Sequence, residues 1–536
     1  MAKSLIIDTR LIQDNLENIF TPDLIWPIHQ SQYDKPLARF ISWLDEIHKE
    51  IKDNPRLLNA FLLVKSDLTK DLCYYTSSWI DVAEATQNDT ELIYGNDQHI
   101  IQELLTDEFY GHLPTDMRRY QATPHFKSLV RSRLSRLKRH IQNRKSLTSN
   151  KSQIYCTSLN HLGNQIAPAT TLPLRFTSED VHRKRKKSTN TPNRVEELAH
   201  QISDNLIKFI GDNYASPSRA FSHHLYYIAL KYLQNGWTDA AIGTVFPDIK
   251  VGSTLITGTG SGYSARLLSY QFLNNDQRVI RTTHGGDQPF FSDMRIFTTE
   301  FPFASKYVTY GDGAAQTLQK IVNEKNESNY RYYTKSFQGA GSDQHTQILH
   351  RSKIKKTINN VAVITGSFYG MYRVVPHRTL RDIVYMEWHR RLLKMTRSYG
   401  YTVISKRHPK GFMAEVPAFS DIAQIELLNM SMKNIEQQTD AYVIDVASSA
   451  FMEAICTLKP VVLIDMPMVD IKADPLSQMR KSVSIIPASF DENNLVTIER
   501  ELLREALEKP VDIAAREQLI NDYLLTPSAN LDSILE

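Results

Sequence analysis

The clearest fold signal in the chain is DAYVIDVASSAFMEAICTLKPVVLID, residues 440–465. An apolar run, a short turn, a helix-forming run and a second apolar run follow one another, which predicts strand, helix and strand in a parallel sheet. The first strand is expected to end at Asp445, with Ser448 and Ser449 where the helix begins. Helix N-termini leave backbone N–H donors free, so the two hydroxyls predict a phosphate site. The alternative is that the serines only cap the helix.

Alternating strand and helix patterns extend on both sides of this stretch. One series begins at QIYCTSL (153–159), and a second begins at NNVAVITGSFYG (359–370). Two such series predict an α/β fold with two Rossmann-like, doubly wound domains facing a cleft. We expect a mostly helical segment at 1–150, standing alone or belonging to the first domain, then domains at 151–345 and 355–536. The polar residues 321–357 predict an exposed linker, and Gly236 is expected to cap a helix that starts near residue 219.

Composition narrows the class of protein. The 536 residues are too many for one ordinary core, and 41% hydrophobic with 23% charged residues is typical of globular proteins. The three cysteines are far apart, which favours a reducing compartment. The first residues lack the apolar run of a secretory signal, and no segment has the roughly 18 apolar residues of a membrane span. We therefore expect a cytoplasmic protein.

Positive charge is concentrated in two segments, although the net charge is only +4. Residues 127–151 carry nine Lys or Arg and no acid, and a second basic cluster occupies 182–194. Apolar residues at helical spacing in 126–147 predict an amphipathic helix. This basic helix either packs on its own domain or contacts the inner membrane peripherally. Nucleic acid is not expected as a partner, because no aromatic binding motif accompanies the charge.

Further groups suited to a nucleotide lie in the second series. VISKRHPKG (403–411) places Lys406 and His408 at a strand end, where their charge suits a phosphate ester. Glu453 lies within the helix that Ser448 and Ser449 begin, where it could accept hydrogen bonds from ribose hydroxyls. Arg373 follows the first strand of this series and is a further candidate for phosphate.

The pattern of 440–465 resembles the C-terminal domain of GT-B glycosyltransferases that build bacterial surface polysaccharides. Similar proteins are the CDP-glycerol polymerases, the bacterial sialyltransferases and the Kdo (3-deoxy-octulosonate) transferases of capsule and lipopolysaccharide synthesis. His408 and Pro409 resemble the His-Pro motif of CMP-sugar-dependent transferases, whose histidine contacts the nucleotide phosphate. The resemblance implies a nucleotide-sugar donor, best a CMP-activated ulosonate such as Kdo. It also implies a lipid-linked glycan or polysaccharide acceptor, such as lipopolysaccharide, O-antigen or capsule.

Catalytic candidates come from the first series. RVIRTTHGGDQPFF (278–291) and YVTYGDGA (307–314) resemble lipopolysaccharide and O-antigen transferases, with a His-Gly-Gly turn after a strand and an acid beyond it. Glycosyl transfer needs a base for the acceptor hydroxyl or a carboxylate nucleophile. The candidates that could supply these groups are His284, Asp287, Glu300 and Asp312. No Asp-x-Asp motif of metal-dependent sugar transferases stands in a suitable position, so neither a metal nor another cofactor is expected.

The glycine-rich turn in LITGTGSGYSARLL (255–268) supports a rival hypothesis. Its first part is similar to the first motif of S-adenosylmethionine methyltransferases, but such enzymes need an acid at the end of the next strand. That strand ends in Arg-Thr-Thr-His instead. We therefore assign the turn to the acceptor side, with Ser261, Tyr263 and Arg266 as contacts. A non-enzymatic scaffold that binds anionic lipid through the basic clusters is a further alternative.

Overall fold

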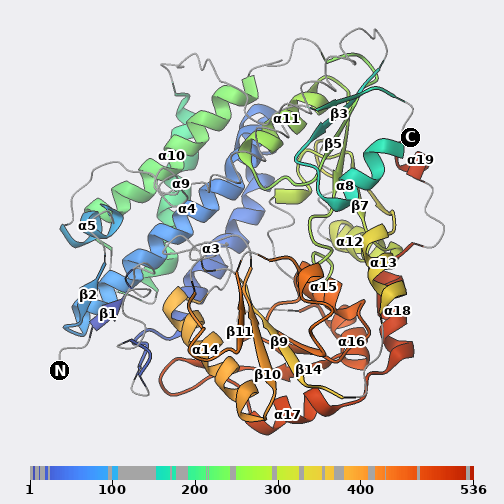
Figure 1. Ribbon diagram of the computed structural model, residues 1–536. Coiled ribbons are helices and arrows are strands. Elements are labelled where there is room, and N and C mark those ends of the chain that lie inside the picture. Colours follow the sequence, from blue (N-terminus) through green and yellow to red (C-terminus); the bar gives the residue numbers. More distant parts are fainter. Residues whose placement is uncertain are drawn as a thin grey trace.

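The computed structural model places the chain in two parallel sheets and a layer of helices (Figure 1). The residues that the structure describes are 4–6, 11, 19–21, 24–94, 99–106, 152–169, 172–176, 191–212, 214, 217–241, 249–291, 299–324, 331–352, 357–366, 368, 380–408, 417–428, 430–467, 471–526 and 531–535. The basic segment 126–147 and Arg373 lie outside these residues. Among the described helices, none combines the length and the apolar character that a bilayer span requires.

The sheet formed by the second series has six parallel strands in the order β11-β10-β9-β12-β13-β14. Its strands are β9 (Asn360–Ile364), β10 (Thr402–Lys406), β11 (Ile425–Leu427), β12 (Ala441–Ile444), β13 (Val461–Asp465) and β14 (Ser484–Pro487). Its helices are α14 (Asp382–Ser398), α15 (Ser449–Ile455), α16 (Ala473–Ser482) and α17 (Arg500–Glu508). The strand order reverses between β9 and β12. Ligands of open α/β sheets bind at such a switch point, beyond the carboxyl ends of the strands.

The sheet formed by the first series also has six parallel strands, in the order β4-β3-β5-β6-β7-β8. Its strands are β3 (Ile154–Thr157), β4 (Leu174–Phe176), β5 (Thr254–Thr257), β6 (Arg278–Thr282), β7 (Lys306–Thr309) and β8 (Ser336–Gly339). Its helices are α8 (His161–Ile166), α11 (Tyr263–Asn274), α12 (Asp312–Glu324) and α13 (Asp343–Arg351). The two sheets confirm the predicted class, α/β with two Rossmann-like units.

Two predictions about local structure were wrong. The expected linker at 321–357 contains β8 and α13. Both elements consist mostly of polar residues, so neither shows the apolar pattern by which a strand or a helix is recognised. Gly236 does not cap a helix, because α10 (Arg219–Ala241) continues through it. A β-carbon at Gly236 would lie 2.4 Å from the carbonyl oxygen of Ala60. The glycine therefore permits a close approach of two helices.

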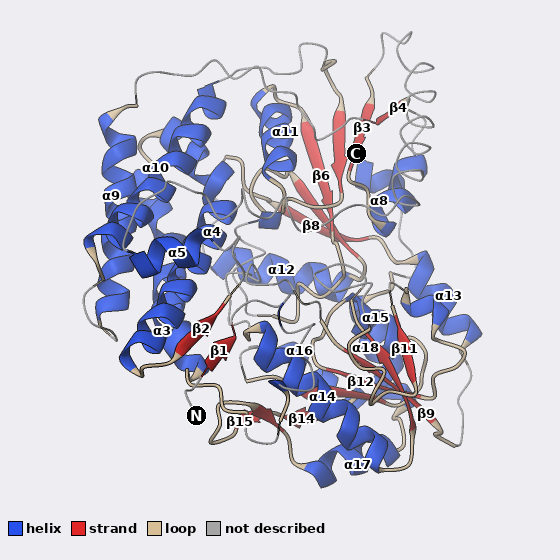
Figure 2. Ribbon diagram, turned by 60° about the vertical axis from the view of Figure 1, so that its left-hand side comes forward, coloured by secondary structure: helices blue, strands red, loops and turns tan. Residues whose placement is uncertain are grey.

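Five helices, four of them long, form a layer beside the two sheets (Figure 2). They are α3 (Gln30–Ile51), α4 (Pro55–Gln87), α5 (His99–Thr106), α9 (Asn193–Gly211) and α10. α4 starts sharply, because the Asn54 side chain accepts from Leu57 N and Pro55 occupies the first turn. Most of α4 is buried, since α3 and α10 pack against it. Its apolar residues join those of α14 in one continuous core cluster.

The last residues of the chain return to the first sheet. α18 (Ile513–Tyr523) packs against α12 of the first sheet and α16 of the second. The Gly311 N–H donates to the Tyr523 carbonyl at 3.0 Å, and Lys306 Nζ donates to the carbonyls of Ser533 and Ile534. The C-terminal segment thereby ties the two sheets together.

Candidate functional site between the two sheets

The His-Gly-Gly turn and the Ser-Ser turn meet across the two sheets. A β-carbon on Gly285, after β6, would lie 3.3 Å from Cβ of Ser449 and 3.1 Å from Oδ1 of Asp287. His284 and Ser449 are exposed, and the Asp287 side chain is half-buried. The two turns are about 160 residues apart in the sequence, and each follows the carboxyl end of a parallel strand. The fold thus brings two separately predicted motifs into one place.

Ser448 stands at the N-cap position of α15 without making the expected cap. Its φ of −91° and ψ of −172° are extended, and its side chain makes no hydrogen bond to the helix. Its carbonyl accepts the first helical bond, from Met452 N at 3.1 Å. Capping by its side chain, the alternative drawn from the sequence, therefore does not explain why a serine stands here.

Glu453 lies in a cavity of about 560 Å³ that helices and loops of both Rossmann-like units line. Representative lining residues are His161, Gln165, Gln344, Arg351, Lys433 and Glu453. Burial raises the pKa of Glu453 from 4.5 to about 7, although the positive charge of Lys406 and a hydrogen bond with Gln344 oppose the rise. A carboxyl group in a polar cavity, with a pKa near neutrality, is typical of functional sites.

Of the basic residues at the end of β10, Lys406 interacts electrostatically with Glu453. Lys406 is 4% exposed, and burial lowers the pKa of its ammonium group while the Glu453 carboxylate raises it. Arg407 instead forms an ion pair with Glu426 at 3.1 Å, so its positive charge is balanced within the second Rossmann-like unit. His408 is exposed at the strand end.

Two aromatic residues beside this site were not predicted from the sequence. Tyr310, buried after β7, stands under the His-Gly-Gly turn, because a β-carbon on Gly286 (φ 78°) would lie 2.7 Å from its ring. Burial raises the pKa of Tyr310, and the carboxylates of Glu453 and Asp287 raise it further. The ring meets the edge of His345, whose pKa burial lowers to about 4. The aromatic-Gly pair in YVTYG was the available signal for Tyr310.

The structure gives Glu300 another role than the one predicted. Its carboxylate accepts from Thr259 Oγ1 at 2.9 Å and from the Gly260 N–H at 3.0 Å. The glycine turn thus already holds an anion that the chain itself supplies, at the backbone N–H that a cofactor phosphate would use. Glu300, only 7% exposed, therefore braces the turn, and its assignment as a catalytic candidate stays a prediction.

Two of the three predicted acceptor contacts are also engaged inside the protein. Arg266 is fully buried, and its guanidinium donates to the Leu63 carbonyl at 2.9 Å and to Asp67 at 2.6 Å. Tyr263 donates to Asp239 of α10 at 2.5 Å. These bonds give both side chains structural partners, and a role of either in acceptor binding stays a prediction. Ser261 is exposed beside Thr259 and stays a prediction.

Asp312 opens α12 at the end of β7 and is exposed. A β-carbon on Gly339 would lie 2.4 Å from its Oδ1 and 2.6 Å from Thr526 Oγ1, so Asp312 stands next to the returning C-terminal segment. The Glu453 cavity is lined by other residues. Among the catalytic candidates, Asp287 is the carboxylate that the structure places beside the Ser-Ser turn.

No family model and no curated protein matches the chain. Among solved structures, the chain is similar to the crystal structure of a proposed UDP-N-acetylglucosamine 2-epimerase from Listeria monocytogenes. The two sequences are 12% identical, the match covers 72% of this chain and 94% of the other, and the TM-score is 0.36. A likeness of this size indicates no activity for the present chain.

Proposed function

We propose that the protein is a metal-independent glycosyltransferase that moves a sugar from a nucleotide donor to a glycan acceptor. The observation that carries this proposal is the Glu453 carboxyl group. It lies in a polar cavity between two Rossmann-like sheets, in the helix that begins where the Ser-Ser turn meets the His-Gly-Gly turn. An enzyme that joins two substrates needs such a site, with one substrate bound by each sheet.

The second sheet would bind the donor. Glu453 would accept hydrogen bonds from the ribose hydroxyls, and Ser448 and Ser449 would donate to the phosphate. Lys406 and His408 would add positive charge as the phosphate leaves the sugar, and groups held in place before the reaction stabilise such charge most effectively. The opposite effects of Lys406 and Glu453 on each other's pKa support this division of roles.

The first sheet would bind and activate the acceptor. Asp287 and His284 stand on the turn that faces Ser449, within reach of a hydroxyl that approaches the donor from that side. Either group could remove the proton of the acceptor hydroxyl. The motif resemblance supports a CMP-activated ulosonate such as Kdo as the donor. It also supports a lipid-linked lipopolysaccharide, O-antigen or capsule acceptor at the inner membrane face, with the basic segment 126–147 near the lipid.

Titration calorimetry with CMP, CDP, UDP, GDP and S-adenosylhomocysteine, in the presence of EDTA, tests the proposal. We expect CMP to bind most tightly and to raise the melting temperature, since a ligand specific for the folded state stabilises it. A Ser448→Ala, Ser449→Ala double variant should bind CMP about tenfold more weakly, through the loss of hydrogen bonds to a charged group. Ser398→Ala, at the far end of α14, is the matched control and should bind normally.

Two outcomes would contradict the proposal. Binding of S-adenosylhomocysteine without binding of any nucleotide would favour a methyltransferase. Normal CMP binding by the double serine variant would remove the phosphate site from this position.

A further inference from the structure

α4 contacts both Rossmann-like units through buried ion pairs. Asp67 pairs with Arg266 of α11, beside the first sheet. Asp81 pairs with Arg381, immediately before α14 of the second sheet. The two aspartates are about 21 Å apart along the helix axis, at 1.5 Å per residue. α4 therefore acts as a rigid strut between the units, and Figures 1 and 2 show it running through the helical layer.

Tyr33 contacts both members of the Asp81–Arg381 ion pair. Tyr33 donates to Asp81 Oδ1 at 2.6 Å, and the Arg381 guanidinium lies over the Tyr33 ring at 5.1 Å. The Asp81 side chain is fully buried, and that of Arg381 is 17% exposed. Burial alone would lower the pKa of Arg381, but the Asp81 carboxylate raises it above the ordinary value. Removing one partner would leave the other charge buried and unpaired, which is costly.

One helical turn beyond Arg381, Tyr385 reaches the switch point of the second sheet. Its hydroxyl donates to Asp445 at 2.7 Å and accepts from the Gly366 N–H at 2.5 Å. Asp445 follows β12 and Gly366 follows β9, the two strands between which the strand order reverses. A single hydroxyl thus joins the ends of both strands, three residues before Ser448.

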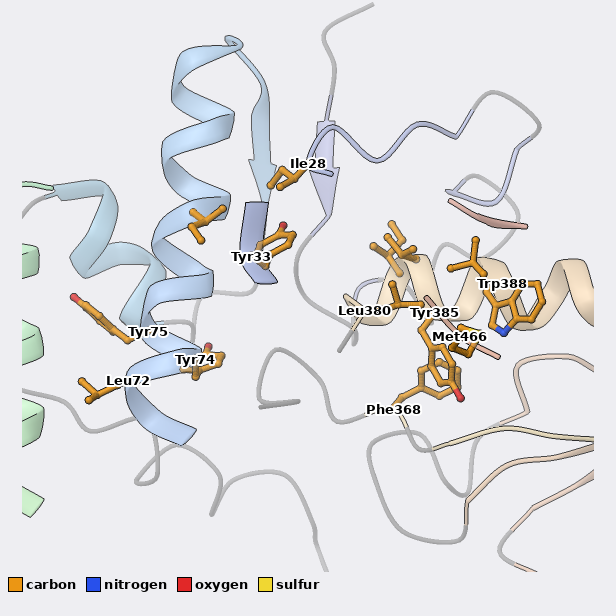
Figure 3. Packing of buried hydrophobic residues seen from close by; sticks show 14 of the residues in the cluster. Ile28, Tyr33, Leu72, Tyr74, Tyr75, Phe368, Leu380, Tyr385, Trp388 and Met466 are labelled. Atoms are coloured by element: carbon orange, nitrogen blue, oxygen red, sulfur yellow. The ribbon is translucent and has the colours of Figure 1, made fainter. Parts of the chain in front are cut away.

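Apolar residues of the same elements belong to one large buried cluster. Figure 3 shows Tyr33, Tyr74 and Tyr75 on the N-terminal helices and Leu380, Tyr385 and Trp388 on and beside α14. All of them belong to one buried cluster. The ion pair therefore lies beside buried apolar residues of both elements, and it supplies the direct link between α4 and the start of α14.

We propose that Arg381 and Tyr385 are positioning residues of the donor site. α4, anchored on α11, holds α14 through the Asp81–Arg381 pair, and α14 sets the turns after β9 and β12 through Tyr385. The consequence for ligand binding rests on the proposed function. The mechanical link itself does not, so the two can be tested separately.

Hydrogen exchange of the full chain without ligand tests the link. In Arg381→Met and Asp81→Asn, we expect amides of 382–388 and 440–449 to exchange about tenfold faster, while β5 and β6 keep the parent rate. Arg381→Lys should restore part of the protection. The control Asp45→Asn breaks the buried Lys65–Asp45 pair between α3 and α4, and it should leave both peptides unchanged. Equal effects of Asp45→Asn and Asp81→Asn, or unchanged exchange in Arg381→Met, would overturn the link.

The conservative variant Tyr385→Phe tests the positioning role. It removes one hydroxyl and keeps the ring, and we expect CMP affinity to fall about fivefold, together with a modest fall in melting temperature because buried Asp445 loses a donor. The matched control is Tyr399→Phe, which should bind CMP normally. The Tyr399 hydroxyl donates to the Arg500 carbonyl, at the other end of α14. Equal CMP affinity of parent and Tyr385→Phe would contradict the positioning role. If the parent itself does not bind CMP, the proposed function fails, and the exchange data alone decide on the link.

Discussion

A Glu453→Gln variant is expected to be more stable than the parent protein at pH 8 and yet to bind CMP at least about tenfold more weakly. Burial raises the pKa of Glu453 from 4.5 to about 7, so the folded state holds this proton more tightly than the unfolded state. The stability of the parent protein therefore falls as the pH rises from about 4.5 to 7, and the loss is complete above 7.

Glutamine removes that loss, because it stays neutral at every pH. The gain at pH 8 should be about 1–2 kcal/mol, less than the full shift in pKa implies, because Glu453 retains some contact with solvent. Thermal melts between pH 5 and 8 should show the variant's advantage disappearing toward pH 5. The control Asp343→Asn removes an exposed carboxylate from the wall of the same cavity and should change neither quantity. A variant that is destabilised at pH 8 would contradict the prediction.

A Gly260→Ala variant is expected to lose about 3 kcal/mol of stability or more. A β-carbon at this position would lie 1.9 Å from the Thr299 carbonyl oxygen and 2.5 Å from Nη1 of Arg281. Neither neighbour can retreat easily, since Arg281 is fully buried and donates to the carbonyls of Glu300 and Pro302. The measurement is the midpoint of urea unfolding followed by circular dichroism.

Gly211→Ala is the matched control for this substitution. No atom lies within 4 Å of the β-carbon it would add, at the end of α9, so its midpoint should stay close to that of the parent. A Gly260→Ala midpoint equal to that of Gly211→Ala would show that the glycine turn tolerates a side chain.

The central strands of both sheets were predictable because most of their apolar residues are adjacent in the sequence and buried together. β12 and β13 are the clearest examples, since both are central strands and nearly every residue in them is buried. β8 and α13 were missed for the opposite reason. The strand is SFQG, and buried residues of the helix include His345 as well as Ile348, so composition gives little sign of either element.

The site was only partly predictable, because a side chain's role depends on partners that lie far away in the sequence. Ser448, Ser449, His284 and Asp287 stand in recognisable motifs, and the fold brings these motifs together. Arg266 and Glu300 also looked suitable for a site. Their partners, Asp67 and the Gly260 N–H, lie 199 and 40 residues away, and only the folded chain shows that both side chains are already engaged.

The strut also bears on how the chain acquires its structure during synthesis. Asp81 and Arg381 are 300 residues apart, so α4 is complete long before its partner on α14 leaves the ribosome. At about 5–20 residues per second this interval lasts roughly 15–60 s. During that time Asp81 has no counter-charge from Arg381, and the buried cluster that α4 shares with α14 is incomplete. The N-terminal helices should therefore be a preferred binding region for chaperones on the nascent chain, until α14 arrives and completes their packing.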